Sequence, residues 1–448
     1  MKKKLFIKIV SSMLVCFTLF AFAGCVPTYP VEATTTPSTD TSTPEVTTKP
    51  DLFAQPTKIT ILSWWDATSK TALKLFKANF EGLHPNAKIE YTRIPGSMYA
   101  DKVITMVAGG EQMPDVMMLA MDQVPRYALG GAIQDLTPYI TEEYKENTYP
   151  IAMDALKVNN KIYAVARDIT STVMYCNKKM FTDAGVDIPK EGWTVDDFLE
   201  ISKKLTKYDD AGKPIQWGYA MNFWPDSVYD WFLIFGGDYI SEDGTTSTMN
   251  TPESKAAMQF LSDLLYKYKV APTRTELEQF GGNENAAVVA SKAAMAIGGL
   301  LSSDSFIKAN PPLEYEMFPL PLSKSGKAVS HAFVNTWCMP EGAKNPELSW
   351  AVLDYLSGKQ GQQIVLEERM GLPANKEVDT SALLAARPDN KCLIDSLTYA
   401  VPFKTTLNSN DYLNVWKEEM EYLYSNAKSV DEIAAAIDKR GNEILSKK

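Results

Sequence analysis

The sequence contains few of the residues on which catalysis and covalent cross-linking usually depend. Only two of its 448 residues are histidines, and we find no G-x-S-x-G, H-E-x-x-H, Walker or G-x-G-x-x-G motif. Three cysteines, Cys176, Cys338 and Cys392, follow residue 25, an odd number without metal-like spacing. We therefore expect no disulfide framework, no metal site and no cofactor, and we interpret these cysteines as small core residues.

The sequence also lacks an excess of basic residues. Without the four lysines of its first eight positions, 41 basic residues remain against 55 acidic ones, a formal charge of −14. This balance argues against a nucleic-acid partner and against electrostatic binding to an anionic membrane, and it favours neutral or cationic ligands. Beyond the N-terminal segment no apolar run of about eighteen residues occurs, and the nearly 400 residues from position 52 onward are sufficient for two soluble domains.

The longest apolar stretch lies at the N-terminus and ends on a cysteine. The chain begins "MKKK", continues with a mostly apolar run and closes it with Phe22-Ala23-Gly24-Cys25. These closing residues resemble a bacterial lipobox, which predicts a lipoprotein signal peptide over residues 1–24 and acylation of Cys25, for example with palmitate. An ordinary signal peptide with an incidental cysteine, or an uncleaved anchor, is the alternative.

The segment after Cys25 consists mostly of threonine, serine and proline. Residues 27–50 read "PTYPVEATTTPSTDTSTPEVTTKP" and offer almost nothing apolar to bury. We predict that residues 25–51 form a disordered linker, because such a composition cannot offset its ordering entropy by forming a core. At roughly 3.1 Å per residue the linker reaches at most about 75 Å. That reach suits a domain held on the extracellular side of a Gram-positive cell membrane.

Strand-like and helix-like patterns alternate along the rest of the chain. Residues 58–65 are rich in β-forming residues, residues 68–85 place large apolar side chains at helical spacing, and residues 88–94 form a second strand pattern. Another helical pattern with a Gly-Gly stop precedes a third strand that begins at Asp115. This order predicts a β-α-β unit and a parallel sheet with helices on its faces.

Several later helix starts are marked by capping residues. Thr194 with Asp197, and Ser429 with Glu432, fit the capping box, in which a hydroxyl and a carboxylate satisfy the first backbone N–H groups of a helix. Two further starts combine a capping side chain with proline at the first helical position, and these are Thr251-Pro252 and Asn345-Pro346. The run "DDAGK" at residues 209–213 predicts a hairpin loop.

One segment carries a resemblance to a known family. Residues 161–205, "KIYAVARDITSTVMYCNKKMFTDAGVDIPKEGWTVDDFLEISKKL", resemble the signature stretch of the family 1 extracellular solute-binding proteins, the maltose-binding-protein-like receptors of ABC sugar importers. Family members show a Gly-Lys-Ile-Tyr-like strand, a strand ending in Tyr-Tyr-Asn-Lys and a Trp-Thr that opens a helix. Here Asn160 replaces the glycine and Cys176 the second tyrosine. Further blocks, among them "VAGGEQMPDVMML" and "SKAAMAIGG", follow in the family's order across nearly all of residues 52–448.

The resemblance implies an α/β fold of the periplasmic-binding-protein type, class II, with two lobes and a ligand cleft between them. The N-terminal lobe would comprise residues 52–168 and 331–375, and the C-terminal lobe residues 169–330 and 376–448. Independently of the resemblance, open parallel sheets bind ligands beyond the carboxyl ends of their strands, which is where we expect the cleft.

Aromatic residues are the main candidate ligand contacts, because sugars stack on aromatic rings while their hydroxyls bond to carboxylates, amides and guanidinium groups. Of the nine tryptophans, we assign Trp193, Trp217 and Trp350 to the core. Leu300 stands where the family often has a stacking tryptophan, which argues against that contact here. The candidate ligand-binding residues are Trp64, Trp65, Asp66, Asp122, Arg167, Asp168, Trp224, Trp231, Asn335, Trp337, Tyr412 and Trp416.

Several candidates have an alternative that the sequence leaves open. Neighbouring side chains of a strand point to opposite faces, so only one of Trp64 and Trp65 should meet the cleft, with Trp65 favoured, unless both pack under the following helix. The arginine–aspartate pair at the first crossing could instead form a salt bridge between lobes. Tyr412 and Trp416 lie one helical turn apart and could be a core stripe.

Together these features predict a lipid-anchored, monomeric receptor that captures a carbohydrate, in particular an oligosaccharide, and delivers it to ABC permease subunits. Three alternatives remain: a receptor for another solute such as a peptide or polyamine, a receptor that serves a sensor kinase, and a secreted glycosidase. A glycosidase needs only two carboxylates at a set separation, so counting residues does not exclude it. The resemblance over the whole chain argues against it and against any catalytic residue.

Overall fold

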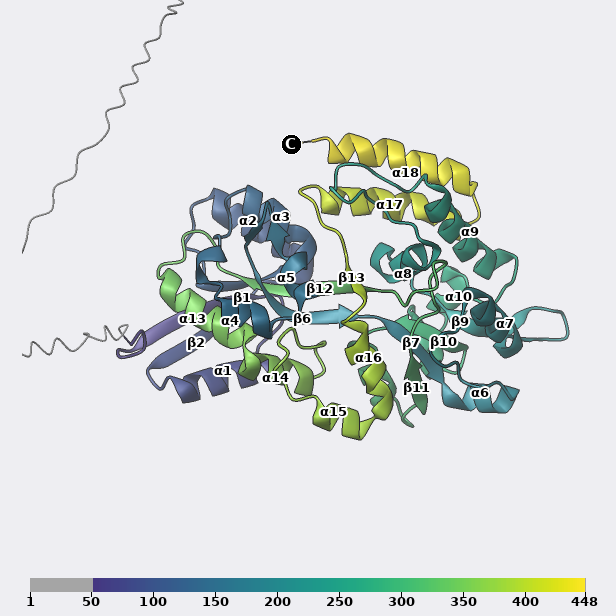
Figure 1. Ribbon diagram of the computed structural model, residues 1–448, viewed down its shortest axis with the longest axis horizontal. Helices are drawn as coiled ribbons and strands as arrows, with labels where there is room; N and C mark the ends of the chain where they lie inside the picture. Colours follow the sequence, from purple (N-terminus) through teal and green to yellow (C-terminus); the bar gives the residue numbers. More distant parts are fainter. Residues whose placement is uncertain (1–50, 448) are drawn as a thin grey trace, which may run out of the picture. The chain divides into compact units, whose positions relative to one another are not determined.

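Two β-sheets organise the part of the chain that the computed structural model describes, residues 51–447 (Figure 1). The predicted signal peptide, the predicted lipidation site Cys25 and the linker up to residue 50 lie outside these described residues. No helix between residues 51 and 447 combines the length and the apolar character needed to cross a bilayer. Helices accompany both sheets, so the predicted α/β class is confirmed.

The first sheet grows from a β-α-β unit. It consists of β1 (Thr57–Ser63), α1 (Thr71–Leu83) and β2 (Ala87–Arg93), and the two strands run parallel over their whole length. The helix buries a stripe at helical spacing that ends at Phe80, which fixes its apolar face against the sheet. The predicted unit is therefore confirmed.

The other strands of this sheet come from distant parts of the chain. The order is β13-β12-β3-β1-β2, with β6 paired to β12. The bounds are β3 (Val116–Ala120), β6 (Val165–Ser171), β12 (Ser330–Cys338) and β13 (Ala400–Pro402). β3 runs parallel to β1, whereas β12 is antiparallel to both β3 and β6. The central strand β12 thus arrives more than two hundred residues after its neighbour β3.

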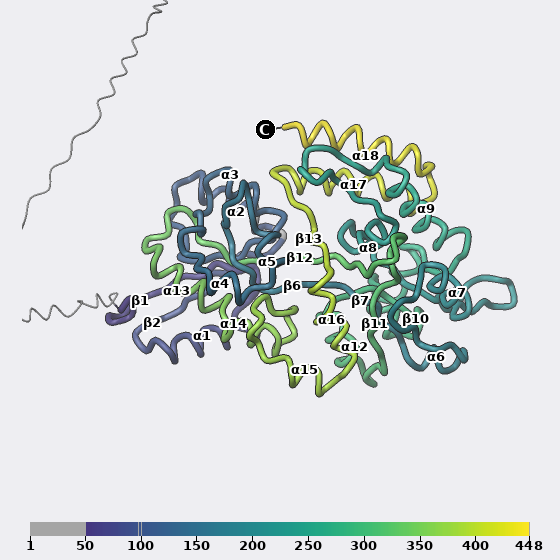
Figure 2. The backbone as a smooth tube through the Cα atoms, in the orientation of Figure 1, coloured from purple at the N-terminus to yellow at the C-terminus, as the bar shows by residue number. Residues whose placement is uncertain are grey.

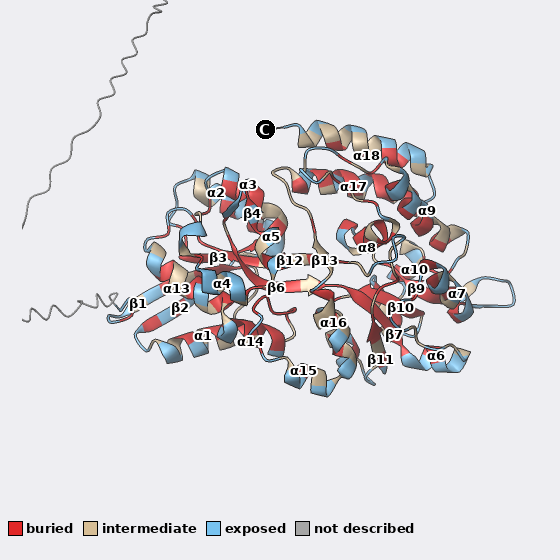
Figure 3. Cartoon of the chain, in the orientation of Figure 1, coloured by how far each residue is buried: buried red, intermediate tan, exposed pale blue. Residues whose placement is uncertain are grey.

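Short helices and one hairpin occupy the chain between and after these strands. They are α2 (Gly96–Ala108), η1 (Met121–Gln123), α3 (Val124–Leu129), η2 (Thr137–Tyr139), α4 (Glu142–Asn147), α5 (Pro150–Ala155), the hairpin β4 (Lys157–Val158) and β5 (Lys161–Ile162), α13 (Pro346–Ser357) and α14 (Lys359–Glu367). Figure 3 shows the strands as mostly buried and the outer helix faces as exposed.

The second sheet has the order β11-β7-β10-β9-β8. Its strands are β7 (Val173–Asn177), β8 (Lys207–Tyr208), β9 (Pro214–Ala220), β10 (Ala293–Gly298) and β11 (Tyr315–Phe318). The accompanying helices are α6 (Lys178–Ala184), α7 (Val195–Leu205), α8 (Pro225–Phe235), α9 (Pro252–Tyr266), α10 (Arg274–Glu278), α11 (Glu284–Val289), α12 (Leu300–Ile307), α17 (Ser409–Tyr424) and α18 (Val430–Leu445).

Three connections link the two sheets, and Figure 2 traces them. In the first, a single residue, Thr172, separates β6 of the first sheet from β7 of the second. In the second, the chain returns from β11 to β12. The third passes from α14 through α15 (Ser381–Ala386), η3 (Pro388–Asn390) and α16 (Lys391–Ser396) to β13, and then enters α17.

The predicted local signals are found in the structure. Thr194 and Ser429 open capping boxes, and Thr251 and Asn345 each cap a helix that begins with proline. Residues 209–213 form the loop between β8 and β9.

The assignment of core residues is confirmed only in part. Trp193 and Trp217 are buried, and Cys176 and Cys338 are buried free thiols, while Cys392 is half-buried. Trp350 is a correction, because it is only half-buried and stacks on Tyr139 with ring centroids 5.2 Å apart. A large ring near the start of a surface helix can pack against a neighbouring loop instead of entering the core.

Candidate functional site

The carboxyl end of β1 presents two tryptophans side by side. Trp64 and Trp65 are both half-buried, and their rings meet edge to face at 6.2 Å. Trp64 also lies edge-on to Tyr99, at 5.2 Å, while the backbone N–H of Trp65 donates to the Ser63 hydroxyl at 2.9 Å. This turn leaves both rings partly accessible, so strand alternation does not send one of them fully into the core. Asp66, which follows, accepts hydrogen bonds from Thr68, and these lower its pKa.

A buried charge cluster lies beside these rings. Arg167 and Asp168 are neighbours on β6, with Nε and Oδ2 2.6 Å apart, and both are almost completely buried. Asn335 of β12 donates to the other oxygen of Asp168 at 2.7 Å. Both residues belong to β6, so their salt bridge lies within the first sheet. It is not the salt bridge between lobes that the sequence left open as an alternative. Its charges are mutually compensated, as burial requires.

Two cations lie over the indole of Trp65. The Arg167 guanidinium carbon is 4.1 Å from its ring centroid, and the Lys70 ammonium is 4.6 Å from it. Burial and the nearby Arg167 lower the pKa of Lys70. Such cation–π contacts hold the indole in a fixed orientation. The side of Trp65 that faces these cations is therefore covered by Lys70 and by Arg167, whose charge Asp168 compensates.

A cavity of about 230 Å³ is lined by residues of both sheets' surroundings, from η1 and β12 to α8 and α17. Its lining combines aromatic rings, carboxylates and amides, and its residues are Asp122, Trp224, Pro225, Asp226, Phe333, Phe403, Asn410, Leu413, Asn414 and Lys417. They come from η1, the start of α8, β12, the segment after β13 and α17. These are the group types that bind sugar faces and hydroxyls.

Trp224 and Asp122 are the sequence-predicted residues that this cavity brings together. Trp224 is 53% exposed and carries the Lys417 ammonium 3.8 Å from its ring centroid. Burial raises the pKa of Asp122. The Gln123 amide donates to the Asp122 carboxylate at 2.9 Å, and this hydrogen bond lowers the same pKa by a smaller amount. Phe333 of the cavity and Asn335 of the charge cluster are alternate residues on β12, so the two groups adjoin along one strand.

Four predicted ligand contacts lie in the core instead, and these are Trp231, Trp337, Tyr412 and Trp416. Trp231 is fully buried and packs against Phe198 and Phe260, while its indole N–H donates to the Tyr219 hydroxyl at 3.1 Å. Most residues of α8 after its first turn are buried, whereas Trp224, the N-cap, and Asp226 of the first turn are exposed. The interpretation of Trp231 as a platform is wrong.

Trp337 points from β12 into the core of the first sheet. β12 keeps an unbroken register with β3 from Asn335 to Cys338, and the register shift toward β6 falls between Asn335 and Thr336, where Arg167 of β6 is the extra residue of a β-bulge. Trp337 packs edge to face against Phe76 of α1, at 6.4 Å, and is fully buried. Its prediction as a ligand contact is wrong, whereas Asn335, two residues nearer the start of β12, remains half-buried beside Asp168.

Tyr412 and Trp416 form the core stripe that the sequence left open. Trp416 stacks on Tyr239 at 5.1 Å, and the Tyr412 hydroxyl donates to the Tyr239 carbonyl at 2.6 Å. The adjacent face of α17 lines the cavity with Asn410, Leu413, Asn414 and Lys417. These four positions have the i, i+3, i+4, i+7 spacing of one helix face. This spacing is visible in the sequence, whereas the prediction relied on the aromatic residues of the neighbouring face.

Other residues of the cavity, and Lys70 beside Trp65, were not indicated by any pattern in the sequence. Phe333 and Phe403 reach the cavity through the pairing of β12 with β13, and Asp226 through the first turn of α8. Lys70 lies at the N-terminus of α1, in a position that periodicity does not distinguish. Pairing between two strands that are distant in the sequence sets the positions of Phe333 and Phe403.

A polar network surrounds the residue that joins the two sheets. Thr172 donates to Asp230 of α8 at 3.0 Å, and the Ser330 hydroxyl contacts both Ser171 and Thr172 at the start of β12. His331 Nδ1 lies 3.1 Å from the Asp230 carboxylate. Burial alone would lower the pKa of His331, but Asp230 raises it above its usual value. Within residues 51–447, no group of three histidine, cysteine or acidic side chains could hold a metal ion.

Comparison with known proteins points to one family. The pattern described as bacterial extracellular solute-binding protein matches residues 65–363. A galactooligosaccharide-binding protein of Bacillus subtilis is 22% identical over 369 residues, covering 80% of this chain and 82% of that protein. A maltooligosaccharide ABC transporter solute-binding lipoprotein of Streptococcus pneumoniae is 26% identical over 277 residues, covering 60% and 62%.

A solved structure shows the same fold. The ABC substrate-binding protein of Listeria monocytogenes in complex with cycloalternan superimposes with a TM-score of 0.77 and 24% identity, covering 88% of this chain and all of that one. The two-lobed fold predicted from the sequence is confirmed by this similarity.

Proposed function

Because the chain belongs to the bacterial extracellular solute-binding proteins, we propose that it is the receptor of a carbohydrate ABC importer and captures an oligosaccharide between its lobes. The observation that carries this proposal is the cavity lined by Trp224, Phe333, Asp122 and Asp226 together with the amides of α17. Rings offer faces for stacking, and carboxylates and amides bond hydroxyls. The two relatives named for oligosaccharides support the ligand class.

Each side of the site has a distinct part in this proposal. Trp224, from the start of α8, supplies the stacking surface, and Phe333 of β12 supplies a second ring in the same cavity. Trp64 and Trp65, half-buried at the end of β1, do not line this cavity and are proposed to contact the part of the ligand that extends beyond it. Asp122 accepts sugar hydroxyls, while Arg167, Asp168 and Asn335 fix the wall behind them. Residues 52–168 with 331–375, and 169–330 with 376–448, are the two lobes that close on the ligand. The protein binds its ligand and returns it unchanged, so no residue is catalytic.

The membrane attachment is part of the same proposal. Cys25 carries the lipid, residues 25–51 hold the lobes away from the extracellular face of the membrane, and the loaded protein docks on the permease as a monomer. The name of the Streptococcus pneumoniae relative, a solute-binding lipoprotein, supports this arrangement. Cys25→Ser should release the chain from the membrane fraction without changing its affinity for ligand.

A calorimetric titration of the full-length protein with malto-, galacto- and manno-oligosaccharides tests the ligand class. We expect saturable binding of at least one series, with the sugar recovered intact by chromatography. Trp224→Ala should weaken that binding, whereas Ile215→Ala, an exposed residue of β9 outside the cavity, should not. Binding of peptides or polyamines without any sugar, or breakdown of the sugar, would contradict the proposal.

A further inference from the structure

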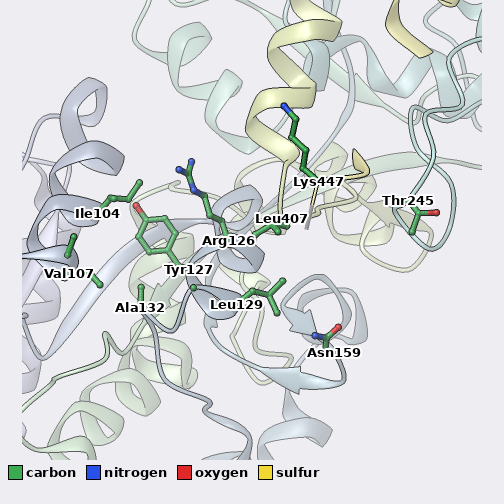
Figure 4. A pocket seen from close by; sticks show the side chains of 12 residues that line it. Ile104, Val107, Arg126, Tyr127, Leu129, Ala132, Asn159, Thr245, Leu407 and Lys447 are labelled. Atoms are coloured by element: carbon green, nitrogen blue, oxygen red, sulfur yellow. The ribbon is translucent and has the colours of Figure 1, made fainter. Parts of the chain in front are cut away.

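Figure 4 shows the residues that line a second, larger cavity, of about 1080 Å³. Its apolar wall comes from Ile104 and Val107 of α2, Leu129 at the end of α3, and Leu407 before α17. Leu129 is 50% and Ile104 36% exposed, so large apolar side chains face open space. A large hollow lined by exposed apolar side chains is typical of a binding surface.

The two cavities share two walls. Asp122 lines the smaller cavity and Arg126 the larger one, four residues further along the continuous η1–α3 run. On the other side, Asn410 lines the smaller cavity and Leu407 the larger, three residues apart at the start of α17. A ligand that extends beyond the sugar site on this side therefore enters the apolar cavity.

The charges of the two cavities differ in sign. Among residues 51–447, the charged residues that line the smaller cavity are Asp122, Asp226 and Lys417, whereas those that line the larger one are Arg126 and Lys447. Neither of these cations forms an ion pair with any residue between 51 and 447. The acidic protein thus presents here an apolar surface bordered by two positive charges that have no ion-pair partner among residues 51–447.

We propose that the larger cavity receives an apolar aglycone that ends in an anionic group, so that the ligand is a sugar conjugate of the carboxylated aryl glycoside type. The aglycone packs on Leu129, Ile104 and Leu407, and its carboxylate lies between Arg126 and Lys447. Charge complementarity and continuity with the sugar site support this occupant. The sugar half of the ligand rests on the proposed function, and the aglycone half rests on this cavity.

Titrations with three matched ligands test the proposal. They are the free trisaccharide (maltotriose, or mannotriose if that series binds), its phenyl glycoside and its 4-carboxyphenyl glycoside. Burial of the ring should tighten binding by about 10-fold over the free sugar. The carboxylate should add about 2- to 5-fold, as partly exposed ion pairs do. Arg126→Gln should remove only the second gain, and Leu129→Asp should remove both.

Leu83→Asp is the matched control, because Leu83 is 52% exposed at the end of α1 and does not line either cavity. It should leave all three affinities unchanged. The anionic apolar dye 1-anilinonaphthalene-8-sulfonate gives a readout without sugar: its saturable fluorescence should be lost in Leu129→Asp and kept in Leu83→Asp. Equal affinities for the three ligands would overturn the proposal. Absence of binding by the free sugar would overturn the proposed function, while the dye would still report on the cavity.

Discussion

At the scale of single residues, exposure separates the tryptophans into two functional groups. Trp224 is the one tryptophan of residues 51–447 that is more than half exposed, and it lies at the edge of the smaller cavity. Trp231, only two helical turns along α8, is fully buried. The same residue type therefore lines a cavity at one end of the helix and packs in the core in its middle.

Truncation of the two rings should affect different measurements. We expect Trp224→Ala to lower ligand affinity by about 30-fold, as removal of an aromatic anchor does, with little change in melting temperature. Trp231→Ala should instead lower the free energy of unfolding by about 3 kcal/mol or more through a core cavity. Calorimetry and denaturation of both variants check this. If Trp224→Ala destabilises the fold as much as Trp231→Ala does, the exposed ring is structural.

Asp168 illustrates a second consequence of burial. Its carboxylate is fully buried and is held by Arg167 and Asn335. Asp168→Ala should lower the free energy of unfolding by about 3–5 kcal/mol, because it leaves a buried guanidinium unpaired. Glu90→Ala is the control, since its pair with Lys58 is 57–61% exposed and should contribute less than about 1 kcal/mol. Urea denaturation of both variants measures the difference, and similar losses would contradict it.

At the scale of secondary-structure elements, β12 contains a buried histidine, His331, whose charge depends on pH. The Asp230 carboxylate holds the pKa of His331 above its usual value despite burial, with a smaller contribution from Asp226. The folded protein therefore binds this proton more tightly than the unfolded chain. The resulting stabilisation is complete below about pH 6.5 and is lost as the pH rises through the folded-state pKa.

His331→Gln should remove this pH dependence. Thermal melts between about pH 5 and pH 8.5 should show the wild-type protein losing its advantage over the variant as the pH rises through the folded-state pKa of His331. An advantage that is constant over this range, or that grows with pH, would mean that His331 is neutral in the folded protein.

The elements themselves were largely predictable from the sequence, because their signals are local. The β1-α1-β2 unit and the capped helices at Thr194 and Ser429 follow from periodicity and capping chemistry over a few residues. The candidate site was predictable only in part. The bulge at Arg167 of β6 and the face that α17 turns toward the cavity depend on pairing and packing between distant segments, which periodicity does not encode.

At the scale of the whole molecule, two sheets joined at a few points should move relative to each other when ligand binds. We expect saturating ligand to reduce the radius of gyration in solution scattering and to raise the melting temperature, because the ligand binds the closed, folded state. A ligand that raises the melting temperature without changing the scattering would indicate a rigid cleft.

The strand order of the first sheet also determines when this protein can fold. β3 ends at Ala120, but its neighbour β12 begins only at Ser330, so one edge of β3 is without its partner until three-quarters of the chain has been synthesised. Contacts of such high sequence separation slow folding. Until the C-terminal part of the chain folds onto it, β3 has an open edge that another chain could pair with, so refolding at high protein concentration should favour aggregation over the native sheet.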